Sequence, residues 1–172
     1  ALFTQAAKEG DDEGWVKGTL SLGTIYADHP TRAADIVVDY NWDNGKNAFG
    51  YEGRAFSPGV AGHGGSSPYE INIPLIASGP SFKKGYQSAV PTSNIDIVPT
   101  ILSIYDLPIP PGMEGRVMKE LLAGQPGHPI PKVKKETRHA IAKFPWGSYE
   151  LILQRSVVEG HRYLDFTRVT RK

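Results

Sequence analysis

Cysteine is absent from this sequence of 172 residues, and so are long apolar runs and long basic runs. Without thiols the chain forms neither disulfides nor thiolate zinc sites, so any metal ion must be bound through nitrogen and oxygen atoms. No apolar run approaches the length of a transmembrane helix, which predicts no membrane span. The formal net charge is +1 and no run of lysine and arginine exceeds two residues, which argues against a nucleic-acid duplex as the partner.

The residues that are present predict a globular chain with many loops. Apolar residues make up 40% of the sequence, and the length is that of about one ordinary domain. The nineteen glycines and fourteen prolines predict loops, particularly over residues 41–70 and 108–132. Segments with helical and with β-prone patterns are mixed along the chain, so the predicted fold class is α/β.

Local patterns assign elements to most of the first 126 residues. They predict, in chain order, the end of a helix over residues 1–8, a buried strand over 34–40, a long loop over 41–62, a strand over 72–77, a helix over 95–105 and a short helix over 117–122. Ser93 or Asn94 can cap the helix over 95–105. Its apolar residues form one broad stripe that is expected to be buried, at positions 97, 98, 101, 102, 104 and 105.

The composition changes after a proline-rich linker at residues 127–131. Three β-prone segments follow over 138–144, 149–158 and 162–169, separated by turns at 145–148 and 159–161. They predict a small antiparallel β tail. The predicted domains are therefore residues 1–126 and residues 127–172.

The most informative short segment is the glycine-rich run around His63. Gly62, Gly64 and Gly65 leave the imidazole without bulky neighbours, and the run precedes an apolar segment. Neutral imidazole is a common ligand of divalent metal ions, which makes His63 a candidate metal ligand. The alternative is a solvent-exposed histidine in a turn, because one histidine alone makes no motif.

Longer stretches of the chain resemble the late part of the alkaline phosphatase superfamily, in the branch of type I phosphodiesterases and nucleotide pyrophosphatases. The resemblance covers residues 18–22, 27–38 and 62–122. Within the last range, the segments similar to that family are Gly62-His63-Gly64, Pro74-Leu75-Ile76-Ala77-Ser78-Gly79-Pro80, Asn94-Ile95-Asp96-Ile97-Val98-Pro99-Thr100-Ile101-Leu102 and Met113-Glu114-Gly115-Arg116-Val117.

This resemblance implies the C-terminal part of a three-layer α/β/α catalytic domain. It implies a divalent-metal cofactor, usually two zinc ions in the intact enzyme, that holds a phosphate ester or nucleotide substrate while a Thr or Ser attacks. The position of the last metal ligand corresponds to His63, and Glu70 is a candidate to orient the other ring nitrogen of that histidine. Enzymes of the family are often exported, so the resemblance implies a periplasmic or secreted protein.

The sequence also departs from the family pattern. Neither the nucleophile nor the Asp-His-Gly run with further ligands is visible, and Asp28-His29 is followed by Pro30, which favours a turn. Ser66 and Ser67 are expected to bond the loop backbone or to cap the turn before Pro68, rather than to act as nucleophiles. The chain is therefore interpreted as the C-terminal portion of a longer enzyme, nearly inactive alone, whose surface left exposed by truncation favours a homo-oligomer.

Two other interpretations stay open at the level of sequence. A sulfatase or a phosphonate hydrolase of the same superfamily would share the histidine loop. A non-catalytic module that binds a partner or dimerises through its β-rich tail would use the glycine run only structurally. Of the remaining candidates, Arg116 is expected to be structural, His128 to lie on a surface linker, and His139 and His161 to be hydrogen-bonded within or beside strands.

Overall fold

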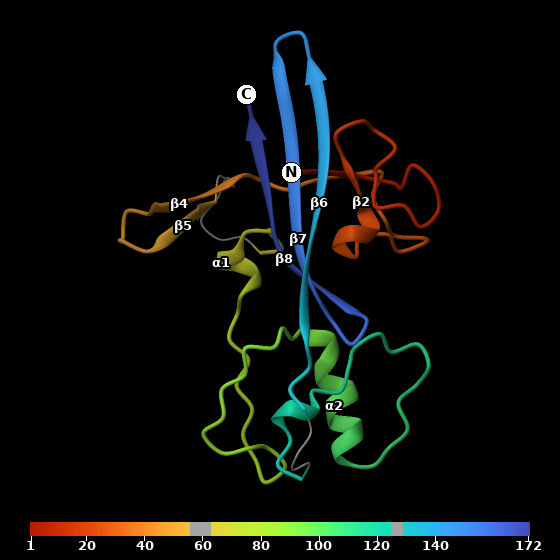
Figure 1. The fold of residues 1–172 in the computed structure, drawn as a ribbon, viewed down its shortest axis with the longest axis vertical. Helices are drawn as coiled ribbons and strands as arrows, with labels where there is room; N and C mark the ends of the chain where they lie inside the picture. The colour runs from red at the N-terminus through yellow and green to blue at the C-terminus, as the bar shows by residue number, and fades with distance from the viewer. Residues whose placement is uncertain (56–62, 125–128) are drawn as a thin grey trace. The chain divides into compact units, whose positions relative to one another are not determined.

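The fold is seen in a computed structural model, which describes residues 1–55, 63–124 and 129–172. These residues combine short helices with strands in three small sheets (Figure 1). They form two compact units. The first unit comprises Ala1–Ile73, Thr137–Arg155 and Leu164–Lys172, and the second comprises Pro74–Glu136 and Ser156–Tyr163. The predicted boundary near residue 126 falls within residues 125–128, outside the described residues, and stays a prediction.

The first sheet of the first unit is built from three short strands. β1 (Leu2–Thr4) lies in the centre, parallel to β2 (Leu20–Ser21) and antiparallel to β3 (Ile36–Val38). The 3₁₀ helix η1 (Leu22–Ile25) follows β2 directly. The predicted strand over 34–40 is confirmed in position but not in burial. Because β3 is an edge strand, Ile36 and Val38 remain 53% and 62% exposed.

The predicted helix end over residues 1–8 is wrong. The side chain of Phe3 is fully buried, and its strand pairs on both sides, with β2 and with β3. A three-residue strand shows neither a helical nor a β period in the sequence, so only tertiary pairing defines it.

The predicted long loop over 41–62 is also wrong over its described part, which is a β-hairpin. β4 (Trp42–Lys46) pairs antiparallel with β5 (Glu52–Ala55). The indole of Trp42 is buried, and its Nε1–H donates to the carbonyl of Thr167 over 2.6 Å. This contact holds the hairpin against the C-terminal strand. Residues 56–62 of the predicted loop lie outside the described residues.

The predicted antiparallel tail is confirmed as a sheet with the strand order β6-β7-β8 (Figure 1). Its strands are β6 (Val133–Phe144), β7 (Gly147–Val158) and β8 (His161–Arg171). Two-residue turns join them, and neighbouring strands joined in this way are antiparallel. The second turn has positive φ at both Glu159 and Gly160, as the favoured hairpin turns require.

Strands from the two ends of the chain share the core of the first unit. Phe3, Leu20 and Leu22 are buried together with Ala140, Leu151 and Leu153 of the tail sheet. The β-rich tail therefore contributes directly to the packing of the N-terminal strands.

The second unit contains the only α-helix longer than four residues in the described part of the chain. α2 (Ile97–Ile104) begins after the 3₁₀ helix η2 (Asn94–Asp96), where Ser93 and Asp96 form a capping box. The predicted helix is confirmed, while Ser93 caps the preceding 3₁₀ helix η2 and the N-cap of α2 itself is Asp96. The 3₁₀ helix η3 (Lys119–Leu121) stands where a short helix was expected.

Two predictions about the second unit are wrong. The predicted strand over 72–77 has no regular structure, neither in residues 72–73 of the first unit nor in residues 74–77 of the second. The apolar stripe of α2 is not buried either, since Val98 and Ile101 are 47% and 45% exposed and Tyr105 is 71% exposed. The buried positions of this helix are instead Pro99 and Thr100.

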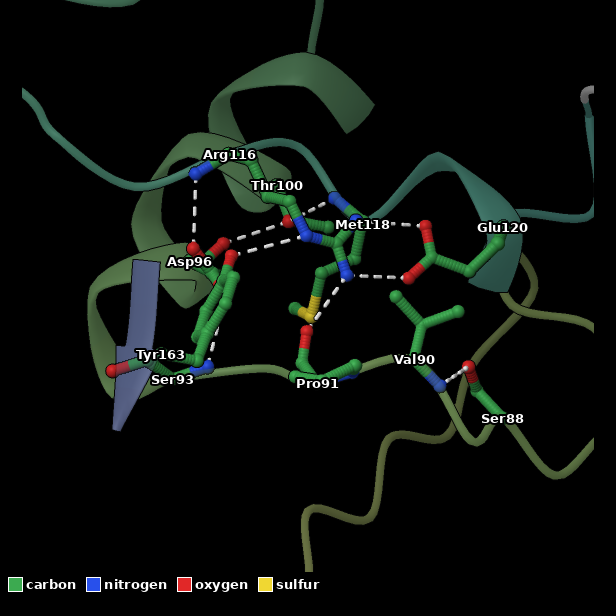
Figure 2. A network of polar contacts seen from close by, with 10 residues as sticks. All are labelled: Ser88, Val90, Pro91, Ser93, Asp96, Thr100, Arg116, Met118, Glu120 and Tyr163. Atoms are coloured by element: carbon green, nitrogen blue, oxygen red, sulfur yellow. Dashed lines mark hydrogen bonds and ion pairs between the residues drawn. The ribbon is translucent and has the colours of Figure 1, made fainter. Parts of the chain in front are cut away.

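α2 is held in the second unit through a buried polar network (Figure 2). The Asp96 carboxylate accepts hydrogen bonds from the Tyr163 hydroxyl at 3.0 Å and from the Arg116 backbone N–H at 2.9 Å. The Arg116 guanidinium makes a bidentate ion pair with Glu120, at 2.9 and 2.6 Å. Arg116 and Glu120 are 3% and 0% exposed. The expected structural role of Arg116 agrees with these contacts.

Candidate functional site

The described structure resumes at His63, which is exposed to solvent. Its imidazole makes no hydrogen bond or ion pair with another described residue. The next residue, Gly64, has a φ of +83°, in the region predicted for these glycines. The ring is therefore accessible, and both of its nitrogens are available to a ligand within the part of the chain that the structure describes.

The segment that follows His63 is fixed by Ser66. Ser66 is 6% exposed, and its backbone N–H donates to Asp39 Oδ2 over 3.1 Å, while its hydroxyl also contacts that carboxylate. On the other side, the hydroxyls of Ser66 and Thr167 are hydrogen-bonded, and the Thr167 N–H donates to the Ser66 carbonyl over 2.9 Å. The loop is thus held between the residue after β3 and strand β8.

Ser67 then starts the short helix α1 (Pro68–Ile71). Its hydroxyl accepts from the Glu70 backbone N–H over 3.2 Å and donates to Glu70 Oε2 over 3.0 Å. The predicted capping role at this turn is confirmed for Ser67. The carboxylate of Glu70 makes no hydrogen bond to the His63 ring among the described residues, so its role in orienting that ring stays a prediction.

Asp39 is the residue of this site that sequence reasoning missed. Burial raises the pKa of Asp39, and the hydrogen bond from the Ser66 backbone opposes that rise. A carboxylate placed directly after an apolar strand is the signal that could have identified it, because strand ends commonly position polar groups. Its hydrogen bonds make it an anchor of the histidine loop.

The predicted site residues that the structure describes do not by themselves form a metal site. Within residues 1–55, 63–124 and 129–172, no group of three or more His, Asp and Glu side chains could hold a metal ion. His29 lies in a turn, where its carbonyl accepts from the N–H groups of Arg32 and Ala33, as expected for Asp28-His29-Pro30. His63 is therefore a single candidate ligand.

The other histidines agree with the structural roles expected for them. His139 Nδ1 lies 3.1 Å from Glu150 Oε1, and His161 Nδ1 lies 2.7 Å from the carbonyl of Glu114. His128 lies outside the described residues. The described helices are all too short or too polar to cross a membrane.

Comparison with known proteins finds relatives over about half of this chain. It is 34% identical over 91 residues to an extracellular sulfatase Sulf-1 homolog of Caenorhabditis elegans, covering 52% of this chain and 12% of that protein. It is 32% identical over 90 residues to sulfatase ppz1 of Metarhizium majus, with 52% and 20% coverage. It is 30% identical over 102 residues to GPI ethanolamine phosphate transferase 2 of Candida albicans, with 54% and 10% coverage.

The chain thus spans a fifth or less of the length of these relatives. No family model and no solved structure matches it. The relatives are sulfatases and a transferase of a phosphate-containing group, and together they point to the alkaline phosphatase superfamily without fixing a branch within it.

Proposed function

We propose that this chain is part of a metal-dependent alkaline phosphatase superfamily enzyme that cleaves phosphoric esters, with His63 as one of its metal ligands. The observation that carries the proposal is the state of His63. Its imidazole is exposed and unbonded among the described residues, while Ser66 and Ser67, three and four residues later, are buried and hydrogen-bonded. A loop that is anchored in this way offers one ring nitrogen at a defined position.

The imidazole of His63 can supply one ligand of a metal centre. Imidazole nitrogen suits zinc, and the sequence has no thiolate to compete with it. Two divalent ions, when bound, would neutralise the charge of the transferred group and lower the pKa of the attacking hydroxyl. The remaining ligands and the nucleophile are proposed to lie in parts of the parent protein beyond these residues. The role of this chain is then to fix His63 through Ser66, Asp39 and Thr167.

The branch and the location of the parent enzyme are further parts of the proposal. A phosphodiesterase or nucleotide pyrophosphatase is the first candidate, because of the motifs around His63 and Asp96. A sulfatase is the second candidate, and it is favoured by the names of two relatives. One of these is named as extracellular, which supports a periplasmic or secreted location.

Metal analysis of the protein encoded by the complete reading frame tests the role of His63. We expect His63→Ala to lose bound zinc and to lower turnover of bis(4-nitrophenyl) phosphate by at least about tenfold, since loss of even an outer partner weakens metal sites by roughly 10–100-fold. His29→Ala, which removes another histidine from a turn, is the matched control. It should keep both the bound zinc and the turnover. Unchanged metal content in His63→Ala would contradict the proposal.

Two further measurements separate the alternatives. Turnover of 4-nitrophenyl sulfate above that of the phosphate esters would replace the phosphodiesterase with a sulfatase. The 172-residue chain alone should be nearly inactive under the enzyme proposal. Metal-free protein with a concentration-dependent dimer, found for the protein encoded by the complete reading frame, would favour the non-catalytic module. The exposed side chains of Val98, Ile101 and Tyr105 make such self-association a specific expectation, measurable by sedimentation.

A further inference from the structure

A cavity of about 560 Å³ lies at one end of the tail sheet within the first unit. Its wall combines the turn between β6 and β7, the last residues of β8, and the loop that precedes β2. The volume lies in the range of small-molecule sites, which is roughly 300–1,000 Å³. His63 and the residues that anchor its loop do not line this cavity.

Two close backbone contacts define the shape of the cavity. A Cβ on Gly18 would lie 2.7 Å from the Cβ of Ala142, and Gly18 has a φ of +88°. A Cβ on Gly147, whose φ is +150°, would lie 2.3 Å from the carbonyl oxygen of Lys172. Glycine is required at both positions, because a side chain would displace backbone or a packed strand. The loop that precedes β2 thus lies close against β6. The end of β8 lies close against the start of β7, where the backbones of Ser148 and Lys172 exchange hydrogen bonds.

Three cationic side chains lie around the cavity, and among its described lining residues the only carboxylate is the terminal one of Lys172 in the 172-residue chain. Lys17, Arg171 and Lys172 line it, and none of the described residues in its wall is an aspartate or glutamate. None of the three side chains forms an ion pair or donates a hydrogen bond to another described residue. Elsewhere in the same unit arginines are paired, as Arg54 is with Asp43 and Arg138 with Asp12. A concave surface lined by one sign of charge concentrates ligands of the opposite sign.

The same cavity presents a flat aromatic surface. The rings of Phe144 and Trp146 are stacked, with centroids 5.0 Å apart and an interplanar angle of 10°. Both line the cavity, and Trp146 is 81% exposed. Exposure of the apolar indole to water is unfavourable unless a ligand covers it. The faces of such rings bind other flat rings by stacking.

We propose that this cavity binds a flat aromatic ligand that carries a phosphoryl or sulfuryl group. The ring stacks on the Phe144–Trp146 pair, and Lys17 and Arg171 hold the anionic group. Arginine suits these tetrahedral oxyanions because its guanidinium can donate two parallel hydrogen bonds. The site binds its ligand without a metal ion, so it is independent of the role proposed for His63.

Nuclear magnetic resonance of the 172-residue chain tests this site directly, because the chain has three tryptophans and each gives one indole N–H signal. We expect 1-naphthyl phosphate and 1-naphthyl sulfate to shift the Trp146 signal saturably. The Trp15 signal is the internal control, since Trp15 is 60% exposed but does not line the cavity. 1-Naphthol and inorganic phosphate, which each lack one half of the ligand, should bind at least about tenfold more weakly.

Variants locate the two halves of the site. Trp146→Ala should weaken binding of both esters by roughly tenfold, and Arg171→Ala should weaken it by a similar factor and reduce its dependence on salt. Lys143→Ala removes an exposed cation of β6 that does not line the cavity and should leave binding unchanged, as should His63→Ala. An unshifted Trp146 signal, naphthol binding as tight as that of the esters, or inorganic phosphate binding as tight, would each overturn the proposal.

Discussion

The polar network of the second unit and the histidine loop of the first unit use polar side chains in opposite ways. Asp96, Arg116, Glu120 and Tyr163 are buried, and their hydrogen bonds are directed mainly at one another (Figure 2). In the loop, Ser66 and Ser67 are equally buried and bonded, but His63 is exposed and without a partner among the described residues. In the first arrangement the polar groups satisfy one another, whereas the second fixes a backbone and leaves one side chain available.

This difference separates polar residues that are bonded within the fold from one whose side chain has no partner among the described residues. A buried ion pair such as Arg116–Glu120 must be complete, because a lone buried charge is strongly destabilising. An exposed imidazole costs the fold little, and no contact with a described residue accounts for the placement of His63. Mutations at the two regions should therefore differ in which property they change.

The largest effect on stability is expected from Arg116→Met. This change leaves the carboxylate of Glu120 buried without its partner, which costs about 3–5 kcal/mol of unfolding free energy. Urea unfolding followed by circular dichroism measures the loss. Arg54→Ala, which breaks an exposed ion pair with Asp43, is the control and should be neutral.

The double variant Arg116→Met/Glu120→Leu removes both charges and should recover most of the loss. If the single variant is no less stable than Arg54→Ala, the network is not the structural element described above.

A smaller effect, with a distinct dependence on pH, is expected from Tyr163→Phe. The hydroxyl donates to Asp96 and accepts from Arg116 Nε at 3.1 Å, so its loss should cost about 1–3 kcal/mol near neutral pH. Burial and the neighbouring Asp96 carboxylate raise the pKa of Tyr163 above its ordinary value of 10.0. The folded state therefore keeps this proton where the unfolded state loses it.

The sign of the pH effect follows from that difference. The contribution of Tyr163 is complete below about pH 10 and is lost as the pH rises above that value. Subtracting the pH profile of Tyr163→Phe from that of the natural chain should show this loss. Tyr51→Phe, at a tyrosine that is 73% exposed, controls for the other titrating groups. A flat difference between pH 9 and 11 would contradict the buried contact.

The smallest of the three effects is expected at the loop itself. Ser66→Ala removes the hydroxyl between Asp39 and Thr167 and should cost about 1 kcal/mol, with faster hydrogen exchange at the Thr167 amide. His63→Ala is its matched partner and should leave both the stability and that exchange rate unchanged. Equal destabilisation by the two substitutions would mean that His63 is part of the packing.

The elements that could be predicted from the sequence are those with a local signal. The tail strands have long β-prone runs, and α2 has a capping box ahead of an apolar segment. The hairpin β4–β5 was missed because Asp43, Asn44 and Gly45 within its first strand are turn residues by propensity. Whether the apolar stripe of α2 is buried depends on which other residues pack against it. The sequence of the helix alone does not determine that packing.

The candidate sites divide in the same way. His63 could be selected from its glycine neighbours and from resemblance, and Ser67 from its place before Pro68. The contact of Asp39 and Thr167 with Ser66 could not be predicted, because Asp39 lies 27 positions before Ser66 and Thr167 lies 101 positions after it. The aromatic and basic cavity likewise joins Lys17 to Trp146 and Arg171, and no sequence window contains all three.

The packing of Phe3 against Leu151 and Leu153 also governs when this chain can acquire its structure during synthesis. β1 emerges from the ribosome well before the strand that supplies Leu151 and Leu153 has been made. Contacts so distant in sequence carry a large loop-closure cost and form late. Nascent Phe3 thus stays without these core partners until β7 has been synthesised, and a chain cut short ahead of β7 would leave β1 without much of its hydrophobic interior.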